Sequence, residues 1–141
     1  MGVISGRCFC GAVTWRLEGP VRWAAICHCE DCRRAASADH VSWLGAATAD
    51  LSWAGPRRAY RSSAHARRTA CATCASPMSF ESDEIPDQTC LYAASLDDPS
   101  WYRPSTHLYW SERVAWSAVS DDLPKHDEGL QAAERRGARI V

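Results

Sequence analysis

The stretch RCFCGAVTWRLE, residues 7–18, carries the two signals that decide the fold. From residue 12 to residue 18, apolar and polar side chains alternate, which is the pattern of a half-buried β-strand. Just before this run, Cys8 and Cys10 form a Cys-x-Cys pair, and an extended chain turns both thiols of such a pair to one face. Two thiolates on one face are half of a tetrahedral metal site. The stretch therefore predicts a strand anchored by a metal ion whose other ligands lie elsewhere in the chain.

Similar short runs of strand-forming residues follow along the chain, separated by turn residues. They cover residues 21–26, 40–46, 50–55, 58–62, 78–82, 89–95 and 106–112. The segment EDCRRAA, residues 30–36, places acidic residues first and arginines later, which predicts one short helical turn. These patterns together predict an all-β sandwich or a folded sheet.

The length of 141 residues fits one domain. We expect this domain to cover residues 1–126, because residues 127–141 are charged and alanine-rich and are typical of a flexible tail. The formal net charge of −1 argues against a nucleic-acid partner. Arginines do cluster between residues 57 and 68, which leaves a local anionic ligand open.

The chain shows no targeting or membrane signal that we recognise. Its first residues lack a charged segment followed by an apolar run, and no apolar run approaches the ~20 residues of a membrane helix. We therefore expect a cytoplasmic protein without a membrane partner. Thiols stay reduced in the cytoplasm, so its eight cysteines are interpreted as metal ligands before disulfides.

The segment CATC contains Cys71 and Cys74, a Cys-x-x-Cys pair that supplies two more thiolates. Together with Cys8 and Cys10 it completes a closed tetrahedral set, which predicts a structural zinc ion. The two pairs lie about 60 residues apart, so this ion would tie the N-terminal strand to the middle of the chain. The alternative is that the two pairs are separate reduced thiols.

A third cluster, CHCEDC, contains Cys27, Cys29 and Cys32. Three thiolates without a fourth describe an open zinc site, in which water or substrate takes the last position, as catalytic zinc requires. The alternative is a fourth protein ligand, with four candidates: His28, His40, His107 and Cys90. An iron–sulfur cluster is a further alternative. The isolated Cys90 otherwise fits a small buried hydrophobic residue.

These motifs, in this order, resemble the glutathione-dependent formaldehyde-activating enzyme family, whose zinc-binding domain is shared with centromere protein V. The matching stretches run from about residue 6 to residue 129: GRCFCGAVTW, CHCEDCRRAA, CATCASPMSF, YAASLDDPSWYRPSTHLYWSERVAW and DLPKHDEG. The resemblance implies a mainly β fold of folded-over antiparallel sheets around a structural zinc, with one or two short helices. It also implies two zinc ions per chain, one structural and one catalytic. The structural ion would be held by Cys8, Cys10, Cys71 and Cys74, and the catalytic ion by Cys27, Cys29 and Cys32.

The sequence departs from the family pattern at three positions. The glycine that usually follows the second cysteine cluster is Ser37, and the glycine that usually follows Cys-x-x-Cys is Ala75. The bulky residue that usually precedes this motif is Ala70. Loss of a glycine matters where the backbone needs a positive φ. The metal ligands are intact, whereas the substrate pocket beside Ser37 is expected to differ.

The activity implied by the resemblance is that of a carbon–sulfur lyase, which acts on the adduct of glutathione, or a similar thiol, with formaldehyde. A substrate thiol at the open position of the three-cysteine zinc would be deprotonated and could add to an aldehyde. His28, His40 and His107 are candidates for the proton transfer. Arg33 and Arg34 could pair with glutathione carboxylates, offset the anionic zinc site or form a solvated face.

The alternative function is a non-catalytic binding module stabilised by zinc. The shared domain of centromere protein V supports this alternative, and so does the fact that one scaffold can carry unrelated functions. The two functions differ in what they require of the second cysteine cluster, because only catalysis needs an open coordination position.

Overall fold

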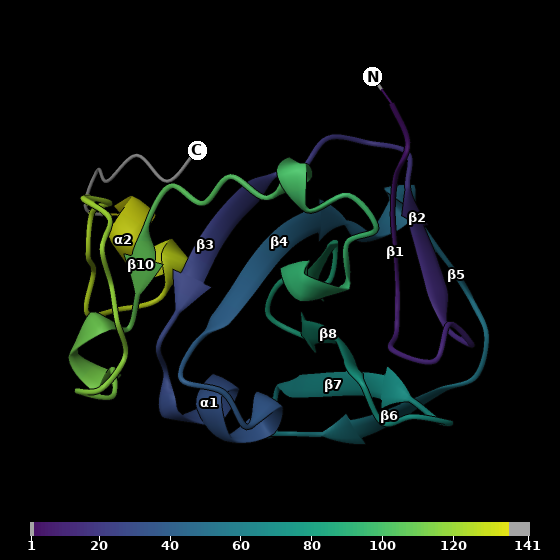
Figure 1. The fold of residues 1–141 in the computed structure, drawn as a ribbon, viewed down its shortest axis with the longest axis horizontal. Helices are drawn as coiled ribbons and strands as arrows, with labels where there is room; N and C mark the ends of the chain where they lie inside the picture. Colours follow the sequence, from purple (N-terminus) through teal and green to yellow (C-terminus); the bar gives the residue numbers. More distant parts are fainter. Residues whose placement is uncertain (1, 136–141) are drawn as a thin grey trace. The chain divides into compact units, whose positions relative to one another are not determined.

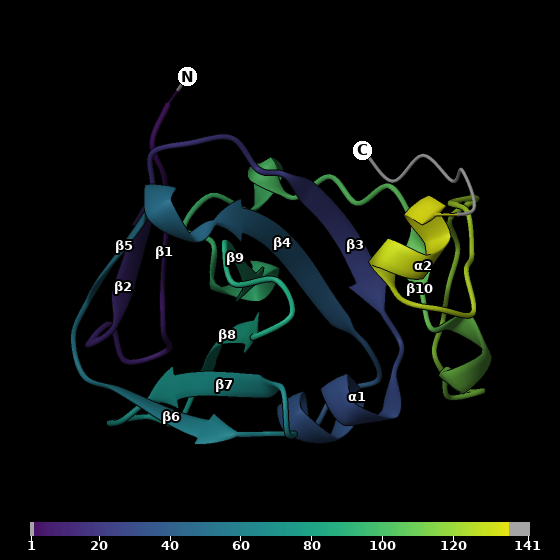
Figure 2. The same cartoon turned by 180° about the vertical axis from the view of Figure 1, so that it is seen from behind.

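The computed structural model describes residues 2–135 and confirms a mainly β fold. Figure 1 and Figure 2 show its short strands and its two α-helices from opposite sides. The strands are β1 (Ile4–Arg7), β2 (Thr14–Leu17), β3 (Trp23–Cys27), β4 (Val41–Ala47), β5 (Leu51–Ala54), β6 (Arg57–Arg61), β7 (Ala66–Cys71), β8 (Pro77–Ser82), β9 (Gln88–Tyr92) and β10 (His107–Leu108). The helices are α1 (Glu30–Ala36) and α2 (Leu130–Arg135).

The described chain forms two compact units. The first contains residues 2–22 and 44–102, and the second contains residues 23–43 and 103–135. Strand β4 begins in the second unit and ends in the first. The expected single domain at 1–126 remains a prediction. The expected flexible tail contains helix α2, and its residues 136–141 lie outside the described residues.

The first unit holds two groups of antiparallel strands. In one, β2 pairs with β1 on one side and with β5 on the other. In the other, β6, β7, β8 and β9 pair in that order, and β4 lies beside β9. Strands β6 and β7 run across the direction of β1 and β2 in both views (Figures 1 and 2). This arrangement confirms the prediction of folded-over antiparallel sheets.

The opening stretch forms its strand as the alternation predicts. In β2, Trp15 and Leu17 are buried while their neighbours are exposed. The Nε1 of Trp15 donates a hydrogen bond to Ser95 Oγ at 2.9 Å. A Cβ atom on Gly6 of β1 would lie 2.4 Å from the Trp15 ring, so glycine is required there. The strand therefore packs its apolar face closely against the first unit's own core.

Two strands, β1 and β7, were not predicted from the sequence. Strand β7 has a buried position that is occupied by a charged residue, because Arg68 is only 5% exposed. Its guanidinium lies 4.8 Å from the centre of the Phe80 ring and donates to the Tyr92 hydroxyl at 3.4 Å. The neighbouring Arg67 instead points outward and pairs with Glu81. A buried arginine with polar and aromatic partners thus takes a core position that hydropathy alone assigns to an apolar residue.

The second unit positions helix α1 directly after strand β3. Strand β3 lies between β4 and β10 in the sheet order. The pairing of β10 with β3 is parallel, with His107 opposite Ile26, so the sheet is mixed rather than purely antiparallel. Helix α1 covers the predicted residues 30–36, and it begins at the second residue after His28. A strand end and a helix start are therefore separated by only two residues, both of which belong to the CHCEDC cluster.

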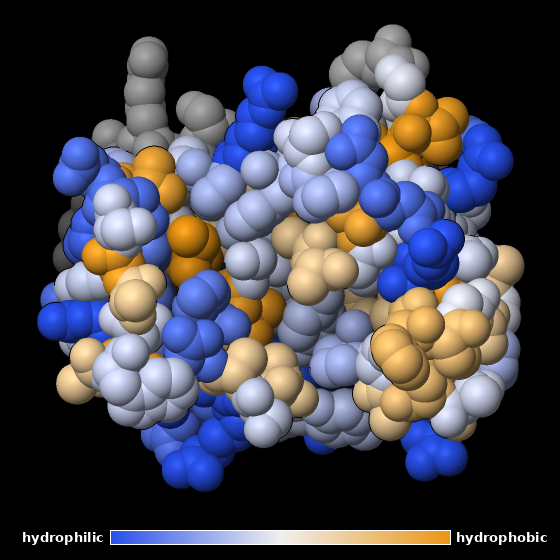
Figure 3. All heavy atoms as spheres, in the orientation of Figure 1, coloured by the Kyte–Doolittle hydropathy of each residue, from blue (hydrophilic) through white to orange (hydrophobic). Residues whose placement is uncertain are grey.

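The surface mixes hydrophilic and hydrophobic side chains on the face shown in Figure 3. Among the large hydrophobic side chains of residues 2–135, Phe9 is 93% exposed and Trp116 is 73% exposed, more than any other. Among residues 2–135, no helix is both long and apolar enough to cross a membrane.

Candidate metal centres and their surroundings

The structure brings the four cysteines of the first set together in the first unit. Cys8 and Cys10 lie in the turn after β1, not on the strand itself, and Cys71 ends β7. The Sγ atoms of Cys8 and Cys10 are 3.6 Å apart, and those of Cys10 and Cys71 are 3.8 Å apart. A tetrahedral zinc–thiolate centre with bonds of ~2.3 Å has sulfur–sulfur distances of about 3.8 Å. The four thiols therefore fit a closed tetrahedral ion.

Backbone and hydroxyl groups around this set suit charged sulfur. The N–H groups of Val13, Thr73 and Cys74 donate to cysteine sulfurs, at 3.3 to 3.4 Å. The Ser76 hydroxyl lies 3.0 Å from the sulfur of Cys74, and its hydrogen bond is the main reason that the pKa of Cys74 is lowered to about 5. Donors aimed at sulfur favour the thiolates that a metal ion needs.

The second set, Cys27, Cys29 and Cys32, forms a separate cluster in the second unit. Cys27 ends β3, Cys29 is the N-cap of α1, and Cys32 lies in the helix's first turn. The Sγ atoms of Cys27 and Cys32 are 3.7 Å apart, and all three sulfurs lie within 4.8 Å of one another. The backbone N–H of Cys32 donates to the sulfur of Cys29 at 3.3 Å, which fixes the cap.

The cluster of three has the geometry of an open site. Within the described part of the chain, no further cysteine, histidine or carboxylate joins it within the same 4.8 Å. The neighbouring Cys29 and Cys32 thiols, together with burial, raise the pKa of Cys27 above its usual range. Three thiolates this close repel one another unless a cation neutralises them, so the donor set fits a thiophilic divalent ion such as zinc.

The histidines proposed as fourth ligands form a network of their own. His28 and His107 are 0% and 1% exposed, and His28 Nε2 lies 2.8 Å from His107 Nδ1. His107 Nε2 lies 2.9 Å from Asp121 Oδ1. This hydrogen bond is the main cause of the lowered pKa of Asp121, so the carboxylate is ionised at neutral pH and can only accept. Asp121 therefore accepts a hydrogen bond from His107 Nε2–H.

The direction of the remaining bonds follows from that first one. If His107 donates through Nε2, its Nδ1 accepts, and His28 donates through its own Nε2–H. The pKa of His28 is lowered to about 4, mainly by burial, so the ring is neutral and its Nδ1 carries a lone pair. The opposite tautomer would bury an N–H without an acceptor, because His28 Nδ1 has no hydrogen-bond partner in the structure. The chain thus leaves one bare, buried nitrogen beside the cysteine cluster's backbone.

The indole of Trp110 packs against both histidines of this network. The Trp110 ring packs edge-on against His28, with ring centres 5.0 Å apart, and its centre lies 5.1 Å from that of His107. His40 lies farther away, at 5.7 Å from His28, and its Nδ1 is 3.3 Å from Asp39. Burial raises the pKa of Tyr109, and the nearby thiol cluster raises it further.

The histidines were predicted from the sequence as candidate site residues, but their partners Asp121 and Trp110 were not. No spacing rule connects Asp121 to His107 fourteen residues earlier. Trp110 belongs to STHLYW, a stretch that resembles the family, but the sequence alone indicated no role for it. Cys90, another alternative fourth ligand, lies in β9 and belongs to neither metal-capable cluster.

Of the five arginines between residues 57 and 68, two pair with acids and two lie over aromatic rings within the first unit. Arg61 Nη1 donates to Asp83 at 2.7 Å, and Arg67 pairs with Glu81. The Arg57 guanidinium lies 3.8 Å from the centre of the Trp53 ring. Most of these charges therefore have partners in the same unit, and the expectation that nucleic acid is not a ligand stays a prediction.

Comparisons with known proteins agree with this geometry. No curated protein sequence matches the chain. Its fold resembles a crystal structure of a Rhodobacter sphaeroides protein solved by structural genomics, with a TM-score of 0.54 and 25% sequence identity. That match covers 66% of this chain and 87% of the other. The family model for glutathione-dependent formaldehyde-activating enzyme matches residues 3–112, and the chain belongs to this family.

Proposed function

We propose that this protein is a zinc-dependent carbon–sulfur lyase that makes and breaks the adduct of a glutathione-like thiol with formaldehyde or a related aldehyde. The observation that carries the proposal is the cluster of three thiols without a fourth protein ligand in the described chain. Membership of the family supports the substrate class. A closed structural site needs four ligands, whereas catalysis at a metal needs one free position.

Cys27, Cys29 and Cys32 would hold the catalytic ion, and the other four clustered cysteines would hold a structural one. A zinc ion at the three-cysteine site would supply positive charge that favours the thiolate form of a substrate thiol in the fourth position. The protein's own contribution is to fix the three sulfurs through a strand end and a capped helix start. Strand β3 and helix α1 would thereby hold the three sulfur atoms in position before the substrate binds.

The reaction balances without an oxidant or a reductant. The thiol sulfur forms a bond to the aldehyde carbon, the carbonyl π bond opens, and the thiol's proton is transferred to the new hydroxyl oxygen. The reverse step breaks the same carbon–sulfur bond and returns the proton to sulfur. Holding thiol and aldehyde together removes part of the entropy cost of the bimolecular step.

The proposal includes a reducing location, such as the cytoplasm. All eight cysteines are free thiols in the structure, and the proposed chemistry needs both the ligands and the substrate thiol reduced. Oxidation of any two thiols in the three-cysteine cluster would remove ligands from the site.

The Cys32→Ser variant tests the proposal directly. It removes one of the three sulfur ligands, so formation of the adduct from glutathione and formaldehyde should fall by at least about 100-fold, more than the loss typical of an outer-shell change. Adduct formation is measured by proton-exchange NMR on zinc-loaded protein. Circular dichroism should show the fold retained, because the four-cysteine set is unchanged.

The control is Cys90→Ala, which removes a buried thiol that belongs to neither cluster. It should turn over substrate within about twofold of the unaltered protein, since volume-conserving changes are well tolerated. Full activity of a folded Cys32→Ser protein would contradict the assignment of the reaction to the three-cysteine cluster. Absence of adduct formation by the unaltered, zinc-loaded protein would contradict the lyase and favour a binding module.

A further inference from the structure

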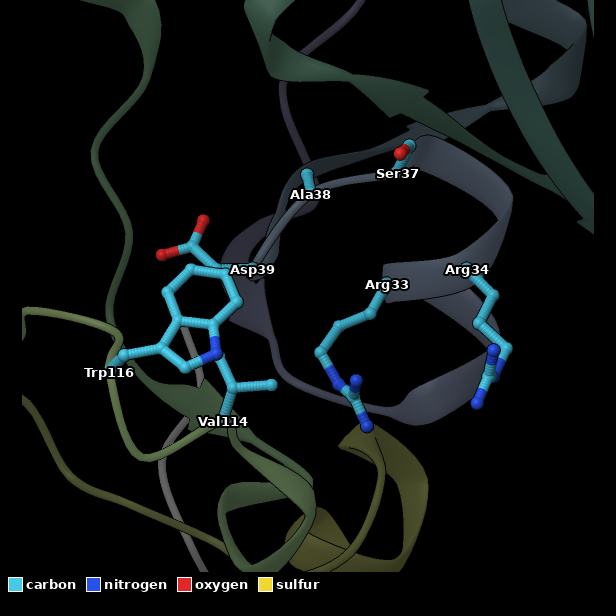
Figure 4. Close-up of a pocket in the computed structure, with 7 residues that line it drawn as sticks. All are labelled: Arg33, Arg34, Ser37, Ala38, Asp39, Val114 and Trp116. Atoms are coloured by element: carbon cyan, nitrogen blue, oxygen red, sulfur yellow. The ribbon is translucent and has the colours of Figure 1, made fainter.

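A surface pocket of about 520 Å³ lies beside helix α1 in the second unit. Helix α1 contributes two arginines, and the segment after residue 113 contributes an exposed tryptophan and a valine (Figure 4). Its lining residues are Arg33, Arg34, Ser37, Ala38, Asp39, Val114 and Trp116. The pocket therefore begins at the residue that follows Cys32 in the chain.

The two arginines of this pocket differ in what they bind. Arg33 donates through Nε to the backbone oxygen of His28 at 3.3 Å, and its terminal nitrogens have no protein partner among the described residues. Figure 4 shows its side chain extending toward the side of Val114 and Trp116. Arg34 points away from Trp116, and its Nε pairs with Glu30 at 2.9 Å. The Arg33 guanidinium is thus held through Nε, while its two Nη atoms are available as a pair of donors. A pair of parallel N–H groups is the geometry that binds a carboxylate.

The opposite wall of the pocket carries a negative charge. Asp39 accepts a hydrogen bond from the Ser117 hydroxyl at 2.9 Å, which is the main reason that its pKa is lowered. A carboxylate has about four acceptor positions, so Asp39 retains capacity for another donor. Arg33 and Asp39 line one cavity without pairing with each other.

Trp116 adds an apolar wall to the same pocket. Its side chain is 73% exposed, and in Figure 4 its indole lies beside Asp39. An exposed indole with a polar neighbourhood is typical of a binding surface, because it offers a large rigid area at small entropy cost. A cation, an anion and an apolar wall in one pocket match a small zwitterion with an aliphatic stem.

We propose that this pocket binds the γ-glutamyl end of the peptide thiol, with its α-carboxylate on Arg33, its α-ammonium on Asp39 and its methylene groups against Trp116. The inference rests on the proposed function, since it assumes that the same molecule brings its sulfur to the three-cysteine cluster. The pocket and the cluster share helix α1, in which Arg33 directly follows Cys32. An extended tripeptide spans about 10 Å, about the length of this short helix. The pocket thus selects the thiol by its amino-acid end and leaves the sulfur free to react.

The test uses S-methylglutathione, which keeps the peptide but has no thiol for a metal. We expect zinc-loaded protein to bind it in isothermal titration calorimetry. Arg33→Gln should weaken this binding about 10- to 100-fold, the loss expected for one charged hydrogen-bonded pair. Arg103→Gln is the matched control, because this exposed arginine of the second unit does not line the pocket, and it should stay within about twofold. Equal effects of the two substitutions would overturn the proposal.

A second pair of measurements tests the ammonium contact and separates the two ends of the peptide. Asp39→Asn should weaken binding of S-methylglutathione but not of its N-acetyl derivative, which has no ammonium. Of two shorter thiols with the sulfur methylated, γ-glutamylcysteine should keep most of the affinity and N-acetylcysteinylglycine should lose it. The reverse order would place the glycyl end in the pocket and overturn the assignment.

The outcome is separable from that of the proposed reaction. If the protein binds S-methylglutathione through Arg33 but never forms the adduct, the binding pocket is supported and the lyase reaction is contradicted. If the protein forms the adduct but its binding of S-methylglutathione does not depend on Arg33, the lyase reaction is supported and the binding pocket is contradicted. Metal content is measured for each variant, so that loss of zinc is not mistaken for loss of the contact.

Discussion

Three non-glycine residues of the described chain have a positive φ, and two of them, Ser37 and Ala75, stand at the positions where the sequence departs from the glycine of the family pattern. Ser37 ends helix α1 with φ of 50°, and Ala75 follows the Cys-x-x-Cys turn with φ of 64°. The left-handed region costs an ordinary residue roughly 1–2 kcal/mol, because Cβ approaches the following carbonyl oxygen. The departures noted in the sequence are therefore strained positions beside each cysteine cluster.

Replacement of either residue by glycine should stabilise the protein. For Ala75→Gly we expect a gain of about 0.5–1 kcal/mol, since relief of strain exceeds the extra freedom of the unfolded chain. For a chain of this size that is roughly 2–4 °C in Tm, measured by calorimetry on zinc-loaded protein. Ala72→Gly, in the same turn at a negative φ, should instead lower Tm. A loss of stability in Ala75→Gly would show that the turn is relaxed.

The hydrogen bonds from Asp121 through His107 to His28 determine which ring nitrogen of each histidine carries the proton. We expect both histidines to carry their proton on Nε2, since the ionised Asp121 can only accept. Nitrogen-15 NMR of the imidazole rings distinguishes the two tautomers directly. In Asp121→Ala the order imposed on His107 should be lost, and its ring should sample both tautomers. A His28 ring protonated at Nδ1 in the unaltered protein would contradict this direction.

Strand ends and turns, rather than strand interiors, hold the metal-capable clusters. Cys71 closes β7, Cys8 follows β1, and the three-cysteine cluster spans the junction of β3 and α1. Such junctions have short connections, so a ligand set placed there ties separate elements together. The two clusters should therefore differ in what they stabilise: the four-cysteine set joins strands about 60 residues apart, and the three-cysteine set fixes one local junction.

Loss of a ligand from the four-cysteine set should prevent folding of the first unit. Binding of a structural zinc ion contributes about 10–16 kcal/mol in peptides, which is as large as the whole stability of many domains. We expect Cys71→Ser to bind less zinc and to lose its cooperative thermal transition, measured by elemental analysis and calorimetry. Cys32→Ser should keep that transition. Equal unfolding of both variants would show that the two clusters have the same structural role.

The elements that could be predicted from sequence are those whose pattern is local. The alternation in β2 and the charge order of α1 located both correctly, and the cysteine spacings gave both clusters. Strand β7 was missed because buried Arg68 breaks the apolar pattern. The parallel pairing of β10 with β3 depends on a contact between segments about 80 residues apart, which no local pattern encodes.

The same distinction explains what was missed in the candidate site. Ligand thiols are recognisable because cysteine is rare and its spacing is chemical. Asp121 and the wall formed by Asp39 and Trp116 consist of common residue types on separate segments. Only folding brings them to His107 and to helix α1.

The molecule as a whole combines a cluster of four cysteines that fits a closed metal site with a cluster of three that fits an open one. Each cluster lies within one of the two compact units, so the proposed structural ion and the proposed catalytic ion would be held by separate parts of the fold. Four cysteines and three cysteines give a mean of 3.5 sulfur ligands per zinc when both sites are filled. That mean is a direct measure of the free position, because a substrate thiol can raise it only at the open site.

The decisive measurement is X-ray absorption at the zinc edge of protein loaded with two zinc ions, before and after addition of glutathione. We predict that the mean number of sulfur ligands rises from about 3.5 to about 4, and that oxidised glutathione, which has no thiol, leaves it unchanged. A value that already stands at 4 without glutathione, or that stays at 3.5 with millimolar glutathione present, would contradict a thiol-binding catalytic zinc.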